Sequence, residues 1–166
     1  MSVQTVKQYL SQYGKESAVR EFEVSSATVE LAALAVGVIP ARIAKSLTFL
    51  STDGSCIIVV AAGDAKVDNA KYKKQFGCKA KMLSPEEVLA FTGHAIGGVC
   101  PFALASENVT VYLDESLRRF DTVFPAAGSA ASAVEMTCDE LFVCSRAAAW
   151  VDVCKGWQDD DTEAAV

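Results

Sequence analysis

The sequence has few of the residues from which hydrolytic active sites are commonly built. It contains one histidine, so any Ser-His-Asp or Cys-His system must use His94. No strongly placed nucleophile accompanies this residue, and Thr92-Gly93-His94 is also typical of an ordinary turn. The six cysteines include no C-x-x-C pair, and only one histidine is present to help them bind zinc. We therefore expect reduced thiols, no metal and no other cofactor.

Long apolar runs and a hydrophobic leader are also missing. No stretch is long enough to span a bilayer, and the first residues lack the apolar region of a signal peptide. There is no G-x-G-x-x-G, no P-loop and no internal repeat. The hydrophobic fraction of 51% and the charged fraction of 22% are typical of a globular protein. These features predict a cytoplasmic protein with one domain over residues 1–157 and an acidic, disordered tail over residues 158–166.

The net charge of −6 argues against nucleic-acid binding, but the charges are unevenly distributed. Four negative charges lie in the tail, whereas residues 64–81 hold six lysines against two aspartates. A local basic patch attracts phosphates even when the whole chain is acidic. A solvated, lysine-rich helix face is the alternative interpretation. The candidate nucleic-acid contacts are Lys71, Lys73 and Lys74. Neither DNA nor a membrane is an expected partner.

The order of the predicted elements indicates an α+β protein. Helical periodicity and capping residues predict helices over residues 2–13, 28–36, 67–76 and 84–91, and a short helix after residue 137. Alternating or wholly apolar runs predict strands over residues 20–24, 44–50, 56–62, 109–113, 122–126, 131–136 and 150–153. Asp53-Gly54 predicts a hairpin between the second and third of these strands. Hairpins mixed with isolated helices favour a curved mixed sheet flanked by helices.

A lysine within an apolar strand is the most informative feature that is present. Alternate side chains of a strand share a face, so Lys45 points the same way as Leu47 and Phe49. An ammonium on a hydrophobic face is costly unless an anionic group meets it. The alternative is an edge-strand lysine whose charged end reaches solvent.

A glycine-rich loop closed by a proline follows about fifty residues later, with the sequence Gly97-Gly98-Val99-Cys100-Pro101-Phe102. Glycine lets the backbone approach a ligand closely, and proline holds the turn rigid. An ordinary connecting loop is the alternative. Together with Lys45, the loop predicts a site for a small, oxygen-rich, phosphorylated group.

Such a site provides a cation, backbone N–H donors and water rather than a strong base. It suits an activated ester, whose carbonyl needs an oxyanion hole more than its leaving group needs an acid. The donors are expected among the amides of residues 97–100. A thiol mechanism is a further alternative, in which Lys45 lowers the pKa of Cys100.

Between about Thr28 and Val153 the chain resembles the YbaK/prolyl-tRNA-synthetase-associated domain family, whose members hydrolyse wrongly charged aminoacyl-tRNA. The resemblance rests on four stretches in this order: Ile43-Ala44-Lys45-Ser46-Leu47, Ala61-Ala62-Gly63-Asp64, the Gly97–Phe102 loop and Ala127-Gly128-Ser129. It implies an open, barrel-like sheet in which Lys45 and the loop face each other across a pocket.

The resemblance also implies roles for individual residues. Lys45 would anchor the phosphate of the terminal tRNA nucleotide, and the backbone of the loop would grip the aminoacyl end. Water, assisted by the ribose 2′-hydroxyl, would then attack the carbonyl. The implied catalytic residues are Lys45, Gly97, Gly98 and Pro101. The implied substrate-binding residues are Ser46, Val99, Cys100, Phe102, Gly128 and Ser129.

This chain departs from some family members at two places. It has Ser46 where they place Asn after the lysine, and Ala130, Ala131 and Ser132 where they place a histidine. These positions are expected to shape the amino-acid pocket. A pocket distinguishes two side chains that differ by one methylene by only about 1–3 kcal/mol, so small changes in its wall can change the preferred amino acid. We expect a small amino acid such as Ala, Ser, Thr or Cys. The first hypothesis is a free-standing deacylase acting on mischarged tRNA, with a synthetase as a further partner. The second is a non-catalytic module that binds tRNA ends or a synthetase.

Overall fold

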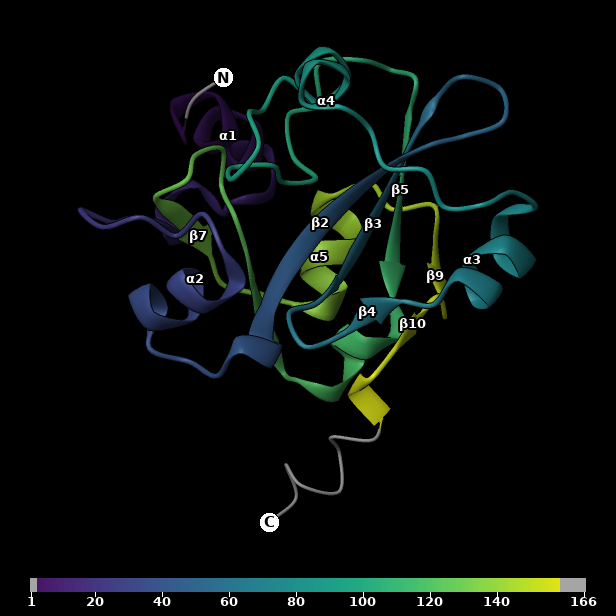
Figure 1. The fold of residues 1–166 in the computed structure, drawn as a ribbon. Coiled ribbons are helices and arrows are strands. Elements are labelled where there is room, and N and C mark those ends of the chain that lie inside the picture. The colour runs from purple at the N-terminus through teal and green to yellow at the C-terminus, as the bar shows by residue number, and fades with distance from the viewer. Residues whose placement is uncertain (1–2, 159–166) are drawn as a thin grey trace.

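The computed structural model describes residues 3–158, and the predicted tail lies outside them apart from Gln158. The fold is α+β, as the sequence predicts, with a curled mixed sheet and helices around it (Figure 1). Its helices are α1 (Val3–Leu10), α2 (Val29–Val36), α3 (Asn69–Phe76), α4 (Pro85–Thr92) and α5 (Cys138–Cys144), with 3-10 turns η1 (Ser11–Tyr13), η2 (Glu16–Ala18), η3 (Pro40–Arg42) and η4 (Glu115–Arg119). Its strands are β1 (Val19–Glu21), β2 (Ile43–Leu50), β3 (Cys56–Ala62), β4 (Lys66–Val67), β5 (Val109–Asp114), β6 (Thr122–Pro125), β7 (Ser132–Val134), β8 (Met136–Thr137), β9 (Ala149–Val151) and β10 (Cys154–Lys155).

The main sheet has six strands in the order β8-β6-β2-β3-β5-β9. β2 and β3 form the predicted antiparallel hairpin, whereas β6 joins β2, β5 joins β3 and β9 joins β5 in parallel. Figure 1 shows β2, β3 and β5 at the centre, with α2 on one side, α3 on the other and α4 near one end. Every residue of β3 is buried. A central strand buried on both faces explains the continuous apolar run from Cys56 to Ala62.

The helix ends follow the capping residues in the sequence. The side chain of Thr28 accepts a hydrogen bond from Leu31 N at the start of α2. Ser84 and Thr137 form capping boxes at the starts of α4 and α5, as their sequences predict. Gly37 and the glycine after α3 end their helices with the left-handed backbone that glycine adopts at little cost. Local sequence therefore fixes most element ends.

Several boundaries differ from the predicted ones. The helix predicted from residue 67 starts at Asn69, because Asp68 caps it and the two residues before pair as β4 with β10. The predicted strand 131–136 is divided at Glu135, and β7 pairs with β1 while β8 pairs with β6. Only residues 150–151 of the predicted strand 150–153 are extended, as part of β9, and a separate strand β10 starts at Cys154 and pairs with β4. The strand predicted over residues 20–24 covers Val19–Glu21. These ends are set by pairing with distant segments, which local pattern does not show.

One large core lies on and around the central strands, and a second, smaller cluster joins α2 to β2 and β6. The small cluster consists of Ala32, Ala33, Ile43 and Phe124. Within residues 3–158, no helix is long and apolar enough to cross a membrane. Residues of both clusters line a hollow beside α2 and β2, and this hollow contains the candidate site.

Candidate active site

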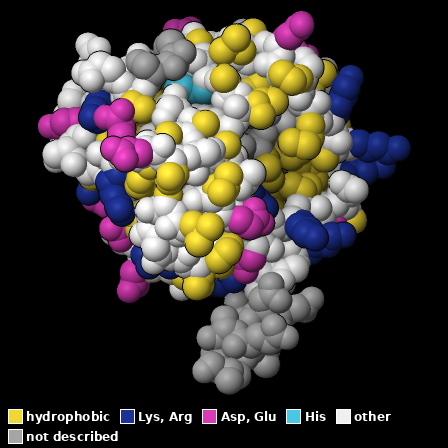
Figure 2. All heavy atoms as spheres, turned by 60° about the vertical axis from the view of Figure 1, so that its left-hand side comes forward, with side chains coloured by type: hydrophobic (Ala, Val, Ile, Leu, Met, Phe, Trp, Pro, Cys, Tyr) yellow, Lys and Arg dark blue, Asp and Glu magenta, His cyan; other side chains and the backbone are white. Residues whose placement is uncertain are grey.

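A pocket of about 240 Å³ lies between β2, α2 and the segment that contains the glycine-rich loop. Its wall contains four of the residues that the sequence predicts for the site: Lys45, Ser46, Gly97 and Val99. Apolar side chains form much of the remaining wall, and Met82 and Ile96 there are each 61% exposed. Figure 2 shows hydrophobic side chains gathered around a hollow on one face of the molecule. The fold thus brings β2 and the loop, about fifty residues apart in sequence, to one pocket.

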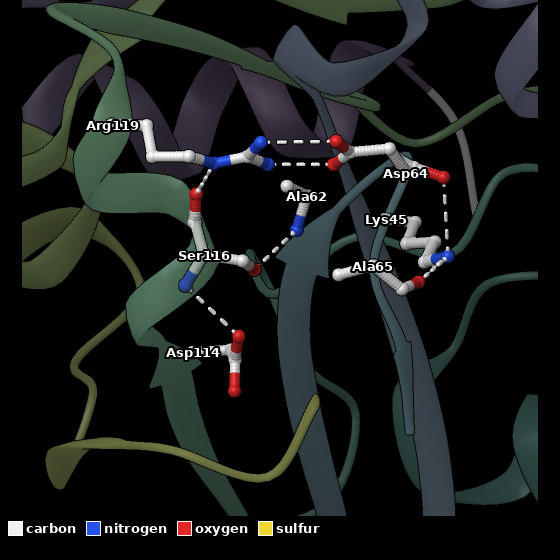
Figure 3. A network of polar contacts seen from close by, with 8 residues as sticks. Lys45, Ala62, Asp64, Ala65, Asp114, Ser116 and Arg119 are labelled. Atoms are coloured by element: carbon white, nitrogen blue, oxygen red, sulfur yellow. Dashed lines mark hydrogen bonds and ion pairs between the residues drawn. The ribbon is translucent and has the colours of Figure 1, made fainter. Parts of the chain in front are cut away.

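Lys45 is held at the point where β3 ends. Its ammonium donates hydrogen bonds to the carbonyl oxygens of Gly63, at 3.3 Å, and Ala65 (Figure 3). An ammonium has three N–H donors, so two bonds to carbonyls leave one for a substrate oxygen. Burial lowers the pKa of Lys45 from its ordinary value, while the nearby Cys154 and Asp64 oppose that shift. The side chain is therefore fixed by the turn after β3 rather than extended into solvent.

The loop after α4 has a backbone that requires glycine. Gly97 has φ +95°, a conformation that other residues rarely adopt. Gly98 packs so closely on the next loop that an added Cβ would lie 2.8 Å from the Cα of Ser129. The Gly98 amide donates to Ala95 O at 3.0 Å, so it is already used within the turn. Of the loop residues, Gly97 and Val99 line the pocket, so their amides are the better candidate donors.

The Gly128-Ser129 segment lies behind this loop rather than on the pocket wall. Gly128 has φ +98°, and the segment turns around the buried hydroxyl of Ser132. The Ser132 Oγ accepts hydrogen bonds from Ala127 N and Ser129 N, both at 3.2 Å, and donates to Ser129 O at 3.1 Å. This turn supports Gly98 from behind. Neither Gly128 nor Ser129 lines this pocket, and Ser129 packs against Gly98. Their contact with the substrate stays a prediction.

Cys100 and Phe102, also predicted to bind substrate, lie in the core with no exposed surface. Burial raises the pKa of the Cys100 thiol to about 12, the opposite of the lowering that a thiol mechanism requires. Pro101 is buried as well, and it borders a second hollow of about 530 Å³ that shares no wall residue with the first. These three residues anchor the loop, and its first part faces the pocket.

His94 is fully buried and belongs to the same anchor. Its Nε2 lies 2.7 Å from Phe102 O and 3.5 Å from the Cys100 sulfur. Because a carbonyl only accepts, Nε2 carries the proton in this bond, and Nδ1 has no hydrogen-bond partner within the described part of the chain. Burial lowers the pKa of His94. The imidazole therefore connects the two ends of the loop and is not simply a surface turn residue.

Several pocket residues were not identified from the sequence. They come from α2 and its approach, from β2 and from β6: Ser26, Thr28, Val29, Ala32, Thr48 and Phe124. The alternation of β2 gave a partial signal, because the small residues Ala44, Ser46 and Thr48 line the pocket and Leu47 and Phe49 do not. Lys45 also lines the pocket, although strict alternation groups it with Leu47 and Phe49. Small side chains on one face of a buried strand leave space there. The Ser46 hydroxyl is buried and, among residues 3–158, has no hydrogen-bond partner.

The three lysines proposed for tRNA contact lie on α3 but differ in surroundings. Lys71 is half-buried and donates to Asp152 and to Cys154 O, each at 3.1 Å. Lys73 and Lys74 are exposed in the last turn of the helix. The ammonium of Lys71 is therefore bound by groups of the protein itself, whereas those of Lys73 and Lys74 are accessible to a partner.

Comparison with known proteins identifies the family of the chain. Residues 23–143 match the aminoacyl-tRNA editing domain. The chain belongs to the aminoacyl-tRNA editing domain family. A solved structure described as a candidate trans-editing enzyme for prolyl tRNA synthetase is 31% identical, with a TM-score of 0.83 over 93% of this chain and 97% of that one. The protein YwhH of Bacillus subtilis is 56% identical over 95% of this chain and its own full length. EbsC of Enterococcus faecalis, described as a candidate Cys-tRNA(Pro)/Cys-tRNA(Cys) deacylase, is 26% identical over 66% of each chain.

Membership of the editing domain family agrees with the resemblance expected from Lys45 and the Gly97–Phe102 loop. Hydrolytic activity on aminoacyl-tRNA is the general function that this family and its described relatives support. The family is also related to prolyl-tRNA synthetases, which points to tRNA and a synthetase as the general class of partner.

Proposed function

We propose that this protein is a deacylase that acts in trans and hydrolyses the ester between a small amino acid and the wrong tRNA. The observation that carries the proposal is the presence of Lys45, Gly97 and Val99 on the wall of one pocket. The solved structure described as a candidate trans-editing enzyme supports action in trans, because the match covers 97% of that chain. We place this reaction in the cytoplasm, where tRNA is charged.

In this proposal Lys45 holds a phosphate oxygen of the terminal nucleotide. Two of its three donors are bound to carbonyls of the turn after β3, and this fixes the direction of the third. The amides of Gly97 and Val99 stabilise the negative charge that develops on the carbonyl oxygen as water attacks. The ribose 2′-hydroxyl assists the water. The loop is held by His94 and by the Ser129 turn, so these amides need little reorganisation during the reaction.

The size of the pocket supports a small amino acid. Its volume of about 240 Å³ is below the roughly 300–1,000 Å³ of pockets for drug-sized ligands. The wall is largely apolar. Ser46 of β2 lies on this wall, and its hydroxyl has no hydrogen-bond partner among the described residues. A substrate donor or acceptor that reaches this hydroxyl would gain a hydrogen bond, so Ala, Ser, Thr and Cys are the proposed side chains.

The proposed reaction does not use a metal. Within residues 3–158, no group of three or more His, Cys, Asp or Glu side chains is placed to hold a metal ion. The reacting groups proposed here are one ammonium, main-chain amides and water. The proposed partners are the 3′ end of the mischarged tRNA and an aminoacyl-tRNA synthetase.

The test is a panel of tRNAs charged separately with Ala, Ser, Thr, Cys and Pro, with release of the amino acid followed over time. We expect fast release of at least one small amino acid by the wild type, and loss of this release in Lys45→Ala. Chelator in excess should leave the rate unchanged. Tight binding without release for every charged tRNA would contradict the proposal and favour the non-catalytic module.

A further inference from the structure

The turn after β3 carries the carbonyl oxygens that hold Lys45, and it is fixed from several sides. Ala65 N donates to Ala62 O at 3.0 Å, and this bond closes the turn. At Gly63 the turn lies against η3 so closely that an added Cβ would be 2.1 Å from Pro40 O. A shift of this turn would move the oxygens of Gly63 and Ala65, and with them the ammonium. The position of Lys45 therefore depends on the residues that hold residues 62–65.

Arg119 is the main side chain that binds this turn from the other side. Its guanidinium donates to both carboxylate oxygens of Asp64, at 2.6 and 2.9 Å, and its Nε donates to Ser116 O at 2.9 Å (Figure 3). Its guanidinium carbon also lies 5.2 Å from the centre of the Trp157 ring and 4.8 Å from that of Phe120. The Arg119 and Asp64 side chains are only 15% and 20% exposed. A guanidinium that makes two hydrogen bonds to one carboxylate, away from water, has a strongly preferred orientation.

The 3-10 turn that carries Arg119 is itself fixed to the end of β3. Ser116 Oγ accepts a hydrogen bond from Ala62 N at 3.1 Å, and Ser116 N donates to the buried Asp114 at 3.0 Å. The other oxygen of Asp114 accepts from Val153 N at 2.9 Å. These contacts place the guanidinium without involving Lys45 directly.

Asp64 lies between the two residues whose carbonyls hold the ammonium. Figure 3 shows its carboxylate turned away from Lys45 and toward Arg119. The carboxylate is nevertheless close enough to act on the charge of Lys45. Without the guanidinium, a poorly exposed carboxylate would be left unpaired, and such a group gains strongly from any nearby cation. Rotation of Asp64 toward Lys45 would then occupy the donor that the substrate needs.

We propose that Arg119 is a positioning residue that keeps the Asp64 carboxylate away from Lys45, so that the ammonium stays available for an anionic oxygen of the substrate. The inference rests on the proposed function for its consequence in catalysis. The contacts themselves do not depend on what the substrate is.

The first test is a double-mutant cycle on deacylation of the tRNA that the wild type hydrolyses fastest. Arg119→Met keeps the length of the side chain and removes the charge, and we expect kcat/KM to fall about 10- to 100-fold. Adding Asp64→Asn should restore the rate to within about 5-fold of the wild type, because an amide cannot neutralise Lys45. A purely structural role for the ion pair predicts a double variant that is no faster than Arg119→Met, and this result would overturn the inference.

The second test needs no substrate, so it separates the inference from the proposed function. The ammonium of Lys45 is titrated by NMR in protein with labelled lysine, with Lys45→Arg used to assign the signal. We expect Arg119→Met to raise the pKa of Lys45 and the added Asp64→Asn to reverse the rise. The other titratable neighbours, which are unchanged in every variant, are Cys154, Lys66 and Glu30. An unchanged pKa of Lys45 in Arg119→Met would refute the inference even if the enzyme were active.

A conservative variant covers the case in which Arg119→Met does not fold. Arg119→Lys keeps a cation opposite Asp64 but cannot make two hydrogen bonds to its carboxylate. It should therefore keep the pKa of Lys45 near the wild-type value and keep activity within about 5-fold. Thermal unfolding of each variant shows whether it is folded. If Arg119→Lys is folded but loses as much rate as Lys45→Ala, the inference is contradicted.

Discussion

The loop that supplies the proposed oxyanion donors should fail when Gly98 is replaced by alanine. Gly98 does not have a left-handed φ, so alanine causes no backbone strain of that kind. Its Cβ, however, would lie 2.8 Å from two main-chain atoms of Ser129 and 3.1 Å from Ala130 N, whereas ordinary contact begins at 3.4 Å. The loop must therefore move by about half an ångström or more, because main-chain atoms cannot rotate away. A misplacement of about 1 Å costs up to about 100-fold in rate, so we expect a loss of roughly 10- to 100-fold.

The assay is single-turnover release of the amino acid from the tRNA that the wild type hydrolyses fastest. The matched control is Gly77→Ala at the end of α3, where φ is +76° and no atom lies within 4 Å of the added Cβ. That variant should lose stability, by about 1–2 kcal/mol from the left-handed backbone, while its rate stays near the wild-type value. A folded Gly98→Ala protein with the wild-type rate would refute the assignment of this loop.

Three further predictions concern His94, Cys100 and the exposed lysines. Burial holds the pKa of His94 below its ordinary value, so the unfolded chain takes up the proton first and stability should fall as the pH drops below about 6.5. His94→Phe should flatten this dependence in denaturant unfolding at several pH values, and an unchanged slope would argue against the buried neutral imidazole. Burial raises the pKa of the Cys100 thiol to about 12, so Cys100→Ser should keep the rate within about 3-fold; a rate reduced to background would favour thiol chemistry instead. Lys73→Glu with Lys74→Glu should weaken tRNA binding and reduce the slope of log affinity against log salt by about 1–2, whereas Lys7→Glu on α1, far from α3 in Figure 1, should not. Equal slopes in the three proteins would leave the α3 lysines as a solvated surface.

Local sequence determines a large part of the fold. The capping residues Thr28, Ser84 and Thr137 act as predicted because an N-cap needs only its own first turn. The β2–β3 hairpin follows from Asp53-Gly54 between two apolar runs, and Gly54 has the expected positive φ of +86°. The division of the late strands could not be predicted, because β7 and β8 take different partners from distant parts of the chain.

The candidate site was predicted less completely than the fold. Lys45 and Gly97 were identified because a charge in an apolar strand and a glycine-rich loop are unusual locally. The sequence did not show which way the loop side chains point. Cys100 and Phe102 were therefore assigned to the substrate, although they are buried in the core. Arg119 gave no signal, because its role depends on a contact with Asp64 across 55 residues. A residue that positions another side chain, as Arg119 is proposed to do, can be identified only when the fold shows which residues are in contact.

The most direct test of the central claim is the single-turnover rate of deacylation in Lys45→Ala, compared with Lys66→Ala. Lys66 is exposed on β4, which pairs with β10 and not with β2, so its replacement removes the same charge without touching the pocket wall. A hydrogen bond to a charged group contributes about 1.5–3 kcal/mol, so we expect Lys45→Ala to lose roughly 10- to 100-fold in rate and Lys66→Ala to keep a near wild-type rate. Equal rates in the two folded variants would contradict the account.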